Sequence, residues 1–223
     1  MPTNSIEPMK RVIIIGAGGH GREVAEILRH QSKHVGGPSV LGFIVDEPNQ
    51  HHEVINGLPV LGDWSWFQSI DRNDVAVICA VGLPDVRKRL VARAVSSGLS
   101  FADAISASAY VSPDAKLGKG VMIFPHTAIS ANTVIDDHVI VNVGATISHD
   151  ARINRYGTIN PGVNLAGNVT IGEGCYLGVG SSVIQRVSIG PWSVIGAGAV
   201  VIQNLPEHVT AVGVPARIIK TGI

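Results

Sequence analysis

The second half of the chain carries an apolar residue at every sixth position. A branched aliphatic side chain recurs without a break at Ile105, Val111, Leu117, Ile123, Ile129, Ile135, Val141, Ile147, Ile153, Ile159, Leu165, Ile171, Leu177, Val183, Ile189, Ile195 and Val201. The residue four positions after each of these is small in every repeat except the last, where it is Leu205. Such a pattern predicts a chain that turns a corner every six residues around a thin apolar axis, with no room for aromatic side chains.

The first hundred residues show apolar strands in alternation with amphipathic helices, which is typical of a βαβ fold. Strands are expected over Arg11–Gly16, Val40–Val45 and Val75–Val81, and helices over Arg22–Arg29 and from about Pro84 to Ser97. This region is too short for a full six-stranded dinucleotide-binding sheet. We therefore expect one mononucleotide-binding half of such a sheet.

A glycine-rich turn separates the first strand from the first helix. Gly16, Gly18 and Gly21 follow the G-x-G-x-x-G pattern, and Asp46 stands at the end of the second strand. Backbone N–H groups of such a turn can hold phosphate, and an acid in that place can bind ribose hydroxyls. The favoured interpretation is a site for a nucleotide or nucleotide sugar. NAD binding and a purely structural turn are the alternatives, and no second catalytic domain follows to support redox chemistry.

Composition excludes several classes of protein. The chain has 17 basic and 17 acidic residues, so it carries no net charge with which to attract nucleic-acid phosphate. No apolar run reaches the length of a membrane span, and no hydrophobic signal core follows the first residues, so a cytoplasmic protein is expected. The two cysteines, Cys79 and Cys175, lack the spacing of a disulfide framework or a metal site. Cys175 occupies a small position of a repeat and is interpreted as a core residue.

Three histidines fall within the repeats. His149 is followed by Asp150, whose carboxylate can hold the imidazole in one tautomer and raise its basicity. His126 follows Pro125, and His138 stands among acidic residues, so both are interpreted as solvated turn positions. His149 is therefore the candidate general base of this region, with a plain surface histidine as the alternative.

The six-residue pattern resembles that of the hexapeptide-repeat acyltransferases, whose fold is a left-handed parallel β-helix with three six-residue sides per coil. The order of motifs is similar to that of bacterial sugar acetyltransferases of the NeuD/PglD type. The motifs are the glycine-rich turn, the strand end Gly42–Asp46, the segment Gly57–Gly62, the strand end Ala80–Gly82 and then the repeats.

This resemblance implies an α/β, half-Rossmann-like domain over residues 10–100 and an all-β left-handed parallel β-helix over residues 101–212. Residues 1–9 would be an N-terminal extension and residues 213–223 a C-terminal cap. Because a β-helix exposes its sides, and relatives cover one side by self-association, a homotrimer is expected.

The resemblance further implies an acetyl-CoA-dependent N-acetyltransferase that acts on a nucleotide-linked amino sugar in surface-glycan biosynthesis, with no metal. His149 would be the general base and Asp150 its assistant. The implied substrate-binding residues are Gly18, Gly19, His20, Asp46, Gly82 and Asn142. Transfer would be direct, because no cysteine or serine is placed to form an acyl-enzyme beside the base.

The resemblance also implies residues that would bind acetyl-CoA, with coils of eighteen residues stacked on one another. Gly167 stands one coil after His149, and its backbone N–H is the candidate donor to the thioester carbonyl oxygen. Val179 and Ala197 correspond to positions that meet the pantetheine arm in relatives, and plain surface positions are the alternative. Two departures are Thr158, where several relatives have a histidine, and Val45, where some have a second acid.

Three other functions are considered. O-acetylation of sialic acid or another sugar hydroxyl is the nearest, because an alcohol also requires a base. A non-catalytic nucleotide-binding scaffold is the second. The third, a β-helical carbonic anhydrase, needs zinc histidines that converge from neighbouring coils, and no histidine pair in the repeats has a suitable spacing. The sequence does not distinguish UDP, GDP and dTDP as the nucleotide.

Overall fold

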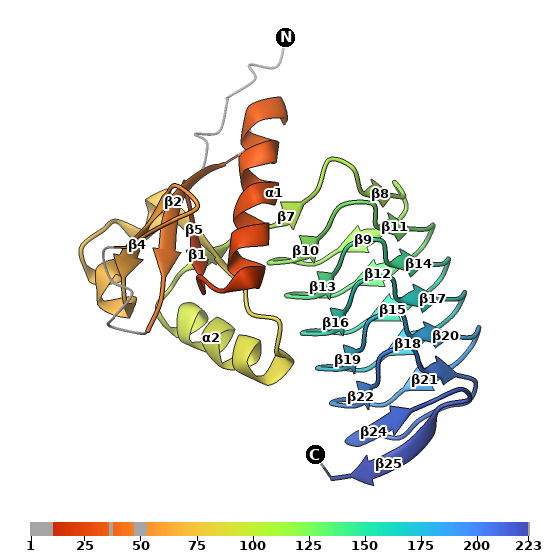
Figure 1. Cartoon of the computed structure of the whole chain (residues 1–223). Helices are drawn as coiled ribbons and strands as arrows, with labels where there is room; N and C mark the ends of the chain where they lie inside the picture. Colours follow the sequence, from red (N-terminus) through yellow and green to blue (C-terminus); the bar gives the residue numbers. More distant parts are fainter. Residues whose placement is uncertain (1–10, 36–37, 47–52, 223) are drawn as a thin grey trace.

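The computed structural model describes residues 11–35, 38–46 and 53–222, which form an α/β domain followed by a regular stack of short strands (Figure 1). The expected extension over residues 1–9 lies outside the described residues. Within these ranges, no helix is long and apolar enough to cross a membrane. The two parts match the fold class expected from the sequence, an α/β domain and a left-handed parallel β-helix.

The α/β domain contains a sheet of six strands in the order β3-β4-β2-β1-β5-β6. Its strands are β1 (Arg11–Ile15), β2 (Ser39–Ile44), β3 (Val54–Ile55), β4 (Leu58–Gly62), β5 (Val75–Cys79) and β6 (Ser100–Phe101). All neighbours are parallel except β3 and β4. The three strands expected from the sequence correspond to β1, β2 and β5, and the sheet contains three further strands. Of the strands that were not expected, β3 and β6 have two residues each, too few to show a hydrophobic period, and β4 contains Pro59, which disfavours the prediction of a strand.

Among the described residues, two α-helices and two 3-10 helices complete this domain. They are α1 (Gly19–Val35), α2 (Pro84–Ser96), η2 (Trp64–Gln68) and η3 (Arg72–Asp74). Helix α1 begins inside the glycine-rich turn, before the first apolar position of the expected helix. A Cβ on Gly21 would overlap the carbonyl oxygen of Gly16, so glycine is required for α1 to pack this closely on the end of β1.

The six-residue pattern predicts the strands of the β-helix: each has two residues and ends on the apolar residue of its repeat. Side one contains β7 (Ala104–Ile105), β10 (Met122–Ile123), β13 (Ile140–Val141), β16 (Thr158–Ile159), β19 (Tyr176–Leu177) and β22 (Val194–Ile195). Side two contains β8 (Tyr110–Val111), β11 (Ala128–Ile129), β14 (Thr146–Ile147), β17 (Asn164–Leu165), β20 (Ser182–Val183) and β23 (Val200–Val201). Side three contains β9 (Lys116–Leu117), β12 (Val134–Ile135), β15 (Arg152–Ile153), β18 (Thr170–Ile171) and β21 (Ser188–Ile189). The hairpin β24 (Val209–Val212) and β25 (Arg217–Thr221) extends side one.

Each repeat places one side chain inside the β-helix and one outside. The second residue of a strand points inward, as with the fully buried Ile153 and Ile159. At the corners the chain enters the left-handed region, for example at Asp150 (φ 58°) and Gly144 (φ 65°). Asn, Asp, His and Gly recur there because they tolerate positive φ better than most residues, although Trp192 (φ 58°) also occupies such a corner.

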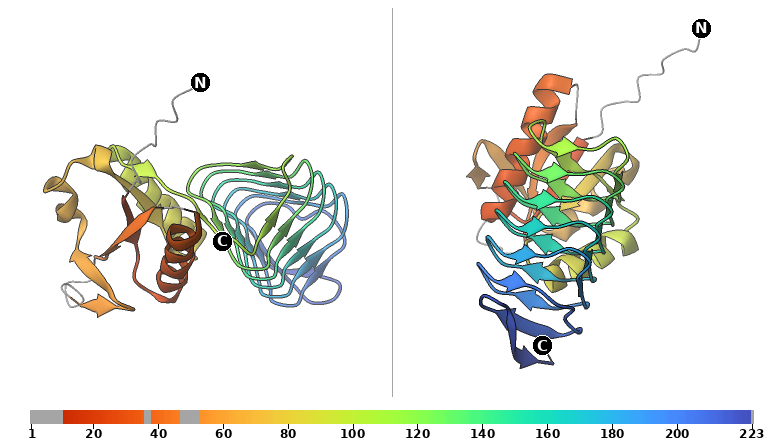
Figure 2. Two further views of the ribbon diagram at one scale, coloured as in Figure 1. Left: turned by 90° about the horizontal axis from the view of Figure 1, so that it is seen from above. Right: turned by 90° about the vertical axis from the view of Figure 1, so that its right-hand side faces the viewer.

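The α/β domain covers side one of the β-helix (Figure 2). The outward side chains of Met122 and Ile140 are fully buried, and they share one core with Val24 and Leu28 of α1. On side two the outward residue of the same coil, Thr146, is exposed. Side one therefore has an apolar outer face because another domain packs on it.

Candidate active site

His149 and Asp150 lie side by side at the corner between sides two and three, directly after β14. Nδ1 of His149 is 2.8 Å from Oδ2 of Asp150. The other carboxylate oxygen accepts a hydrogen bond of 3.2 Å from Nδ2 of Asn132, which occupies the same corner one coil earlier. The His149 side chain is 59% exposed. The pair is thus held in one geometry while the imidazole remains open to a substrate.

The hydrogen bonds to Asp150 determine the protonation states of Asp150 and His149. Donation by His149 and Asn132 lowers the pKa of Asp150, so its carboxylate is ionised at neutral pH. An ionised carboxylate can only accept, and Nδ1 of His149 must therefore carry the proton. The lone pair of neutral His149 is then on Nε2, the nitrogen that points away from Asp150 and can accept a proton.

Gly167 lies against the imidazole, one coil beyond His149. A Cβ at this position would be 2.6 Å from Cε1 and 2.7 Å from Nε2 of His149, so any residue larger than glycine would clash with the imidazole ring. The Gly167 carbonyl accepts a hydrogen bond from Arg186 N–H. Within the described part of the chain, the Gly167 N–H has no acceptor. A base and a free backbone donor therefore lie together on neighbouring coils.

The glycine-rich turn and Asp46 line a cleft at the carboxyl ends of β1, β2 and β5. Gly16, Gly18, Asp46 and Val81 border it, and its volume is about 440 Å³. Asp46 forms an ion pair of 3.4 Å with Arg93. This is the edge at which open α/β sheets bind nucleotides, and the turn directs the start of α1 toward it.

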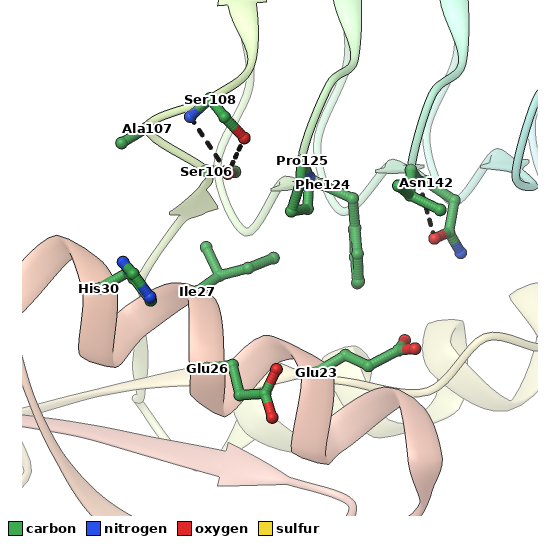
Figure 3. Close-up of a pocket in the computed structure, with 11 residues that line it drawn as sticks. Glu23, Glu26, Ile27, His30, Ser106, Ala107, Ser108, Phe124, Pro125 and Asn142 are labelled. Atoms are coloured by element: carbon green, nitrogen blue, oxygen red, sulfur yellow. Dashed lines mark hydrogen bonds between the residues drawn. The ribbon is translucent and has the colours of Figure 1, made fainter.

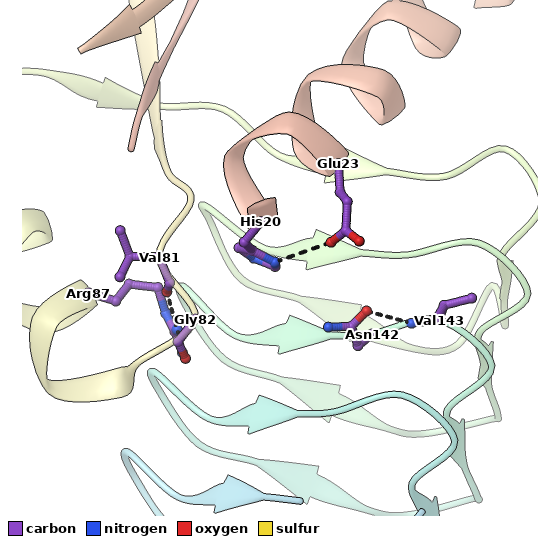
Figure 4. Close-up of polar contacts among 7 residues, drawn as sticks. All are labelled: His20, Glu23, Val81, Gly82, Arg87, Asn142 and Val143. Carbon is purple, nitrogen blue, oxygen red and sulfur yellow. Dashed lines mark hydrogen bonds and ion pairs between the residues drawn. The ribbon is translucent and has the colours of Figure 1, made fainter. Parts of the chain in front are cut away.

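His20 lies at the start of α1, between that cleft and the β-helix. Its ring stacks on Phe124 with 5.1 Å between centroids, and Nδ1 is 3.8 Å from a carboxylate oxygen of Glu23 (Figure 4). Burial and the nearby charge of Arg87 lower the pKa of His20 to about 4. Nε2 is buried without a hydrogen-bond partner in the described structure. His20 is therefore a neutral imidazole with an unused polar atom.

Asn142 lies at the corner between sides one and two, where the β-helix faces α1. It lines a groove of about 680 Å³ with Glu23 and Glu26 of α1 and with Phe124 (Figure 3). The Asn142 side-chain oxygen accepts a hydrogen bond of 2.9 Å from Val143 N–H, which turns its amide NH₂ group outward. A polar group is thus presented where the two domains meet.

The remaining candidate residues fall on two separate corners. Val179 and Ala197 are exposed at the corner between sides one and two, in the same column as Val143. Gly167 and His149 are at the other edge of side two. Within one chain the structure therefore brings His149, Asp150 and Gly167 together, and it leaves Asn142, Val179, Ala197 and the nucleotide-type cleft on different corners or sides.

His138 differs from the expectation of a solvated turn. It is 7% exposed, its ring contacts Phe101 and stacks on Tyr156, and burial lowers its pKa to about 4. It lies at the corner between sides three and one, which the α/β domain covers. The acidic neighbours in sequence were misleading, because corner residues eighteen apart stack and an unrelated part of the chain packs on them.

Arg87 is a residue that sequence analysis missed. Its guanidinium is completely buried between the two domains, and burial lowers its pKa to about 9, so it is charged at neutral pH. A signal was present in the sequence: Pro84, Arg87, Val91 and Ala94 have helical spacing, and all four are buried. Arginine on an apolar helix face indicates a buried contact of this kind.

The two departures from relatives are also placed by the structure. Val45 is buried in the core of the α/β domain, next to the exposed Asp46. Thr158 is buried beneath the same domain, where its hydroxyl donates to the Gly82 carbonyl. Among the described residues, no group of three His, Cys, Asp or Glu side chains is arranged to hold a metal ion.

Comparison with protein families gives a match in each domain. Residues 11–94 match the PglD N-terminal domain, and residues 168–203 match the bacterial transferase hexapeptide repeat. The two matches fall on the α/β domain and on the β-helix, which agrees with the two-part fold.

Solved structures with both domains are similar to this chain. Perosamine N-acetyltransferase from Caulobacter crescentus, solved with CoA and GDP-perosamine, is 37% identical, with 94% of this chain and 96% of that chain covered and a TM-score of 0.87. The acetyltransferase domain of PglB from Neisseria gonorrhoeae, solved with acetyl-CoA, is 31% identical over 95% and 100% of the two chains, with a TM-score of 0.85. WeeI from Acinetobacter baumannii is 29% identical over 95% and 100%, with a TM-score of 0.86.

Proposed function

Because the chain belongs to the hexapeptide-repeat sugar acetyltransferases of the NeuD/PglD type, we propose that it transfers the acetyl group of acetyl-CoA to the amino group of a nucleotide-linked amino sugar. The observation that carries the proposal is the contact between the His149 imidazole and Gly167 on the next coil. A base and an oxyanion donor are the two groups that attack of an amine on a thioester requires.

His149 is the general base of the proposed reaction. The amine nitrogen attacks the carbonyl carbon of the thioester, and Nε2 of His149 accepts the proton that the nitrogen loses. Gly167 N–H donates to the oxygen that becomes negative in the tetrahedral intermediate. The intermediate then collapses with cleavage of the C–S bond, and His149 returns the proton to the thiolate of CoA. Asp150 keeps the proton of His149 on Nδ1 throughout.

The nucleotide part of the acceptor is proposed to bind in the cleft of the α/β domain. Gly18 and Gly19, at the start of α1, offer backbone N–H groups to the diphosphate, and Asp46 can accept from ribose hydroxyls. The sugar would then extend past His20, whose buried Nε2 lacks a partner, toward Asn142. Similarity to an enzyme solved with GDP-perosamine supports this class of acceptor.

Acetyl-CoA is proposed to bind along side two of the β-helix. Gly167 lies at one edge of this side, and Val179 and Ala197 lie at the other. Val179 is 55% exposed, although it is a large apolar residue, and such a residue can pack on the pantetheine arm. Relatives solved with CoA or acetyl-CoA support the same co-substrate here.

A homotrimer is part of the proposal, and the positions of the two half-sites support self-association. The nucleotide-type cleft belongs to the domain that covers side one, whereas His149 is at the corner between sides two and three. A substrate held by one chain would therefore meet His149 of a neighbouring copy. Exposed Val143, Ile184 and Ile202 flank side two and supply apolar surface for self-association.

A cytoplasmic location and a role in surface-glycan biosynthesis belong to the same proposal. The location is proposed together with the two co-substrates, acetyl-CoA and a nucleotide sugar. The structural relatives named above include perosamine N-acetyltransferase, solved with GDP-perosamine, which supports the glycan role.

A release assay for CoA tests the proposed function. Acetyl-CoA would be offered with a panel of UDP-, GDP- and dTDP-linked amino sugars, and with the same nucleotide sugars that carry a hydroxyl in place of the amine. We expect release with at least one amine, together with an acetamide product, and none with its hydroxyl counterpart. Release with free sialic acid or another hydroxyl acceptor, and with no amine, would contradict the proposal in favour of O-acetylation.

A further inference from the structure

Arg87 joins four segments of the chain at the domain boundary. It comes from α2, and it is 0% exposed. Its donors reach the carbonyl oxygens of His138 (2.9 Å), Val81 (2.7 Å), Gly82 (3.0 Å), Tyr156 and Gly157 (3.2 Å), and the hydroxyl of Thr158 (2.9 Å). Two of these acceptors belong to the loop after β5, and four belong to the β-helix.

Every acceptor of Arg87 is a neutral oxygen. A buried guanidinium without a carboxylate is costly unless its N–H groups are satisfied, and here all three nitrogens donate. Core packing alone does not require this charge, because an apolar side chain could fill the same place on the helix. The arrangement instead holds particular backbone carbonyls at a defined distance from one another.

Thr158 completes the connection between the two domains. Its hydroxyl accepts from Arg87 and donates to the Gly82 carbonyl at 2.8 Å. The Gly82 carbonyl therefore has two donors, Arg87 from the α/β domain and Thr158 from the β-helix. Figure 4 shows the contact with Arg87. Thr158 is itself 1% exposed, so neither bond competes with solvent.

The segment held in this way borders the nucleotide-type cleft. Val81 lines the cleft opposite Gly18, and Gly82 follows directly. The guanidinium is also close enough to the glycine-rich turn for its charge to lower the pKa of His20. A loop that must be ordered when a ligand binds reduces affinity, and a loop already fixed does not.

We propose that Arg87 and Thr158 are positioning residues that fix the Val81–Gly82 segment of the nucleotide site against the β-helix. This inference rests on the proposed nucleotide site and adds residues outside the cleft that control its affinity. It also assigns a role in this chain to Thr158, the position at which it departs from several relatives.

A second contact across the same boundary provides a matched control. Nζ of Lys88, next to Arg87 in α2, pairs with Glu173 at 2.7 Å and lies 4.7 Å from the centre of the Trp192 ring. This contact also joins the two domains, but it does not reach Val81 or Gly82. Its loss should weaken the boundary without releasing the loop.

The test compares Thr158→Val, Thr158→Ser and Lys88→Met in the full chain. Affinity for GDP, UDP and dTDP and affinity for CoA are measured separately by calorimetry, with the thermal midpoint as a record of folding. Loss of one hydroxyl that makes two buried hydrogen bonds should weaken binding of the preferred nucleoside diphosphate by about tenfold. CoA affinity should stay within about twofold, and Thr158→Ser and Lys88→Met should bind like the unsubstituted protein.

Each outcome bears on a different statement. Unchanged nucleotide affinity in Thr158→Val, or an equal loss of nucleotide and CoA affinity, would overturn the positioning role and leave the proposed function intact. Failure of the unsubstituted protein to bind any of the three nucleotides would contradict the proposed nucleotide site, and with it the inference. If Thr158→Val does not fold, Arg87→Lys replaces it in the test, because lysine keeps the charge but loses most of the hydrogen bonds. Weaker nucleotide binding with nearly unchanged CoA affinity is then expected as well.

Discussion

At position 167 the lack of a side chain is what allows His149 to occupy its place. In the described structure the backbone N–H of the same glycine has no acceptor, so one residue serves two purposes at the proposed site. The His149 side chain is 59% exposed, so a clash at position 167 would push the imidazole toward solvent and not into the core. A larger residue at position 167 should therefore disturb the geometry of the base much more than the stability of the fold.

The variant Gly167→Ala tests this geometry. A methyl group should displace the imidazole from Asp150 and lower kcat on the order of a hundredfold, with the thermal midpoint nearly unchanged. The double variant His149→Ala/Gly167→Ala should be no slower than His149→Ala alone, because both changes remove the same function. If the loss of activity in the double variant equalled the combined losses of the two single variants, Gly167 would not act through His149.

Individual residues were predictable where local sequence carries the signal. His149 and Asp150 are adjacent in the chain, so their hydrogen bond could be expected from the sequence. The burial of His138 could not, because it depends on contact with Phe101 and Tyr156 from other segments. The burial of Arg87 could have been inferred from the helical spacing of its apolar neighbours, but its six acceptors are scattered along the chain and could not be predicted.

At the scale of the elements, the six-residue period determines the β-helix. All seventeen two-residue strands of its sides end on the apolar residue that the period identifies. The α/β sheet was only partly predictable, because β3 and β6 are too short to carry a pattern and join the sheet through backbone pairing. Sequence periodicity thus specifies elements that bury their own side chains and misses those that neighbours hold in place.

Adjacent residues of β15 should differ sharply in their effect on stability. Ile153 is fully buried on the axis, whereas Arg152 points outward and is exposed. Ile153→Ala should lower the free energy of unfolding by about 2–5 kcal/mol, and Arg152→Ala by less than about 1 kcal/mol. Urea unfolding followed by circular dichroism measures both. Similar losses in the two variants would contradict the assignment of inner and outer positions.

His138, at the corner that packs against the α/β domain, makes the free energy of unfolding depend on pH. Burial and the nearby charges of Arg87 and Arg155 hold the pKa of His138 at about 4, although Asp137 opposes them. Above pH 6.5 the residue is neutral in both the folded and the unfolded chain. Between pH 6.5 and 4 only the unfolded chain binds the proton, so the free energy of unfolding falls as the pH falls.

His138→Phe should remove part of this acid sensitivity. Phenylalanine can keep the contacts with Phe101 and Tyr156 but cannot bind a proton. Between pH 7.5 and 5 the variant should lose about 2 kcal/mol less of its free energy of unfolding than the unsubstituted protein. His126→Gln, at an exposed corner, should behave like the unsubstituted protein. An unchanged pH dependence in His138→Phe would contradict a buried neutral imidazole.

For the whole molecule, the separation of the half-sites is the main consequence of the architecture. One domain covers side one, and the proposed base faces away from it, so the proposed site would combine residues of two copies. Family resemblance indicated a trimer from the sequence. The structural support for that proposal lies in which side of the β-helix the α/β domain covers, and no local sequence pattern contains that information.

Mixing two inactive variants tests the shared site. His149→Ala removes the base, and Asp46→Ala damages the nucleotide cleft. If each site combines the base of one copy with the cleft of another, random mixed trimers should recover about a quarter of the sites. The variants would be refolded together and assayed for CoA release. No recovery, in mixed assemblies verified by native mass spectrometry, would show that each chain contains a complete site.

The rate of acetamide formation by His149→Ala tests the central claim most directly. The variant would be assayed with acetyl-CoA and the acceptor that the panel identifies, after size-exclusion chromatography has shown that its assembly is intact. The account predicts that kcat falls by about two to four orders of magnitude, while the affinities for CoA and for the nucleotide sugar remain close to those of the unsubstituted protein. A normal kcat in intact assemblies would contradict the role of His149 as the general base.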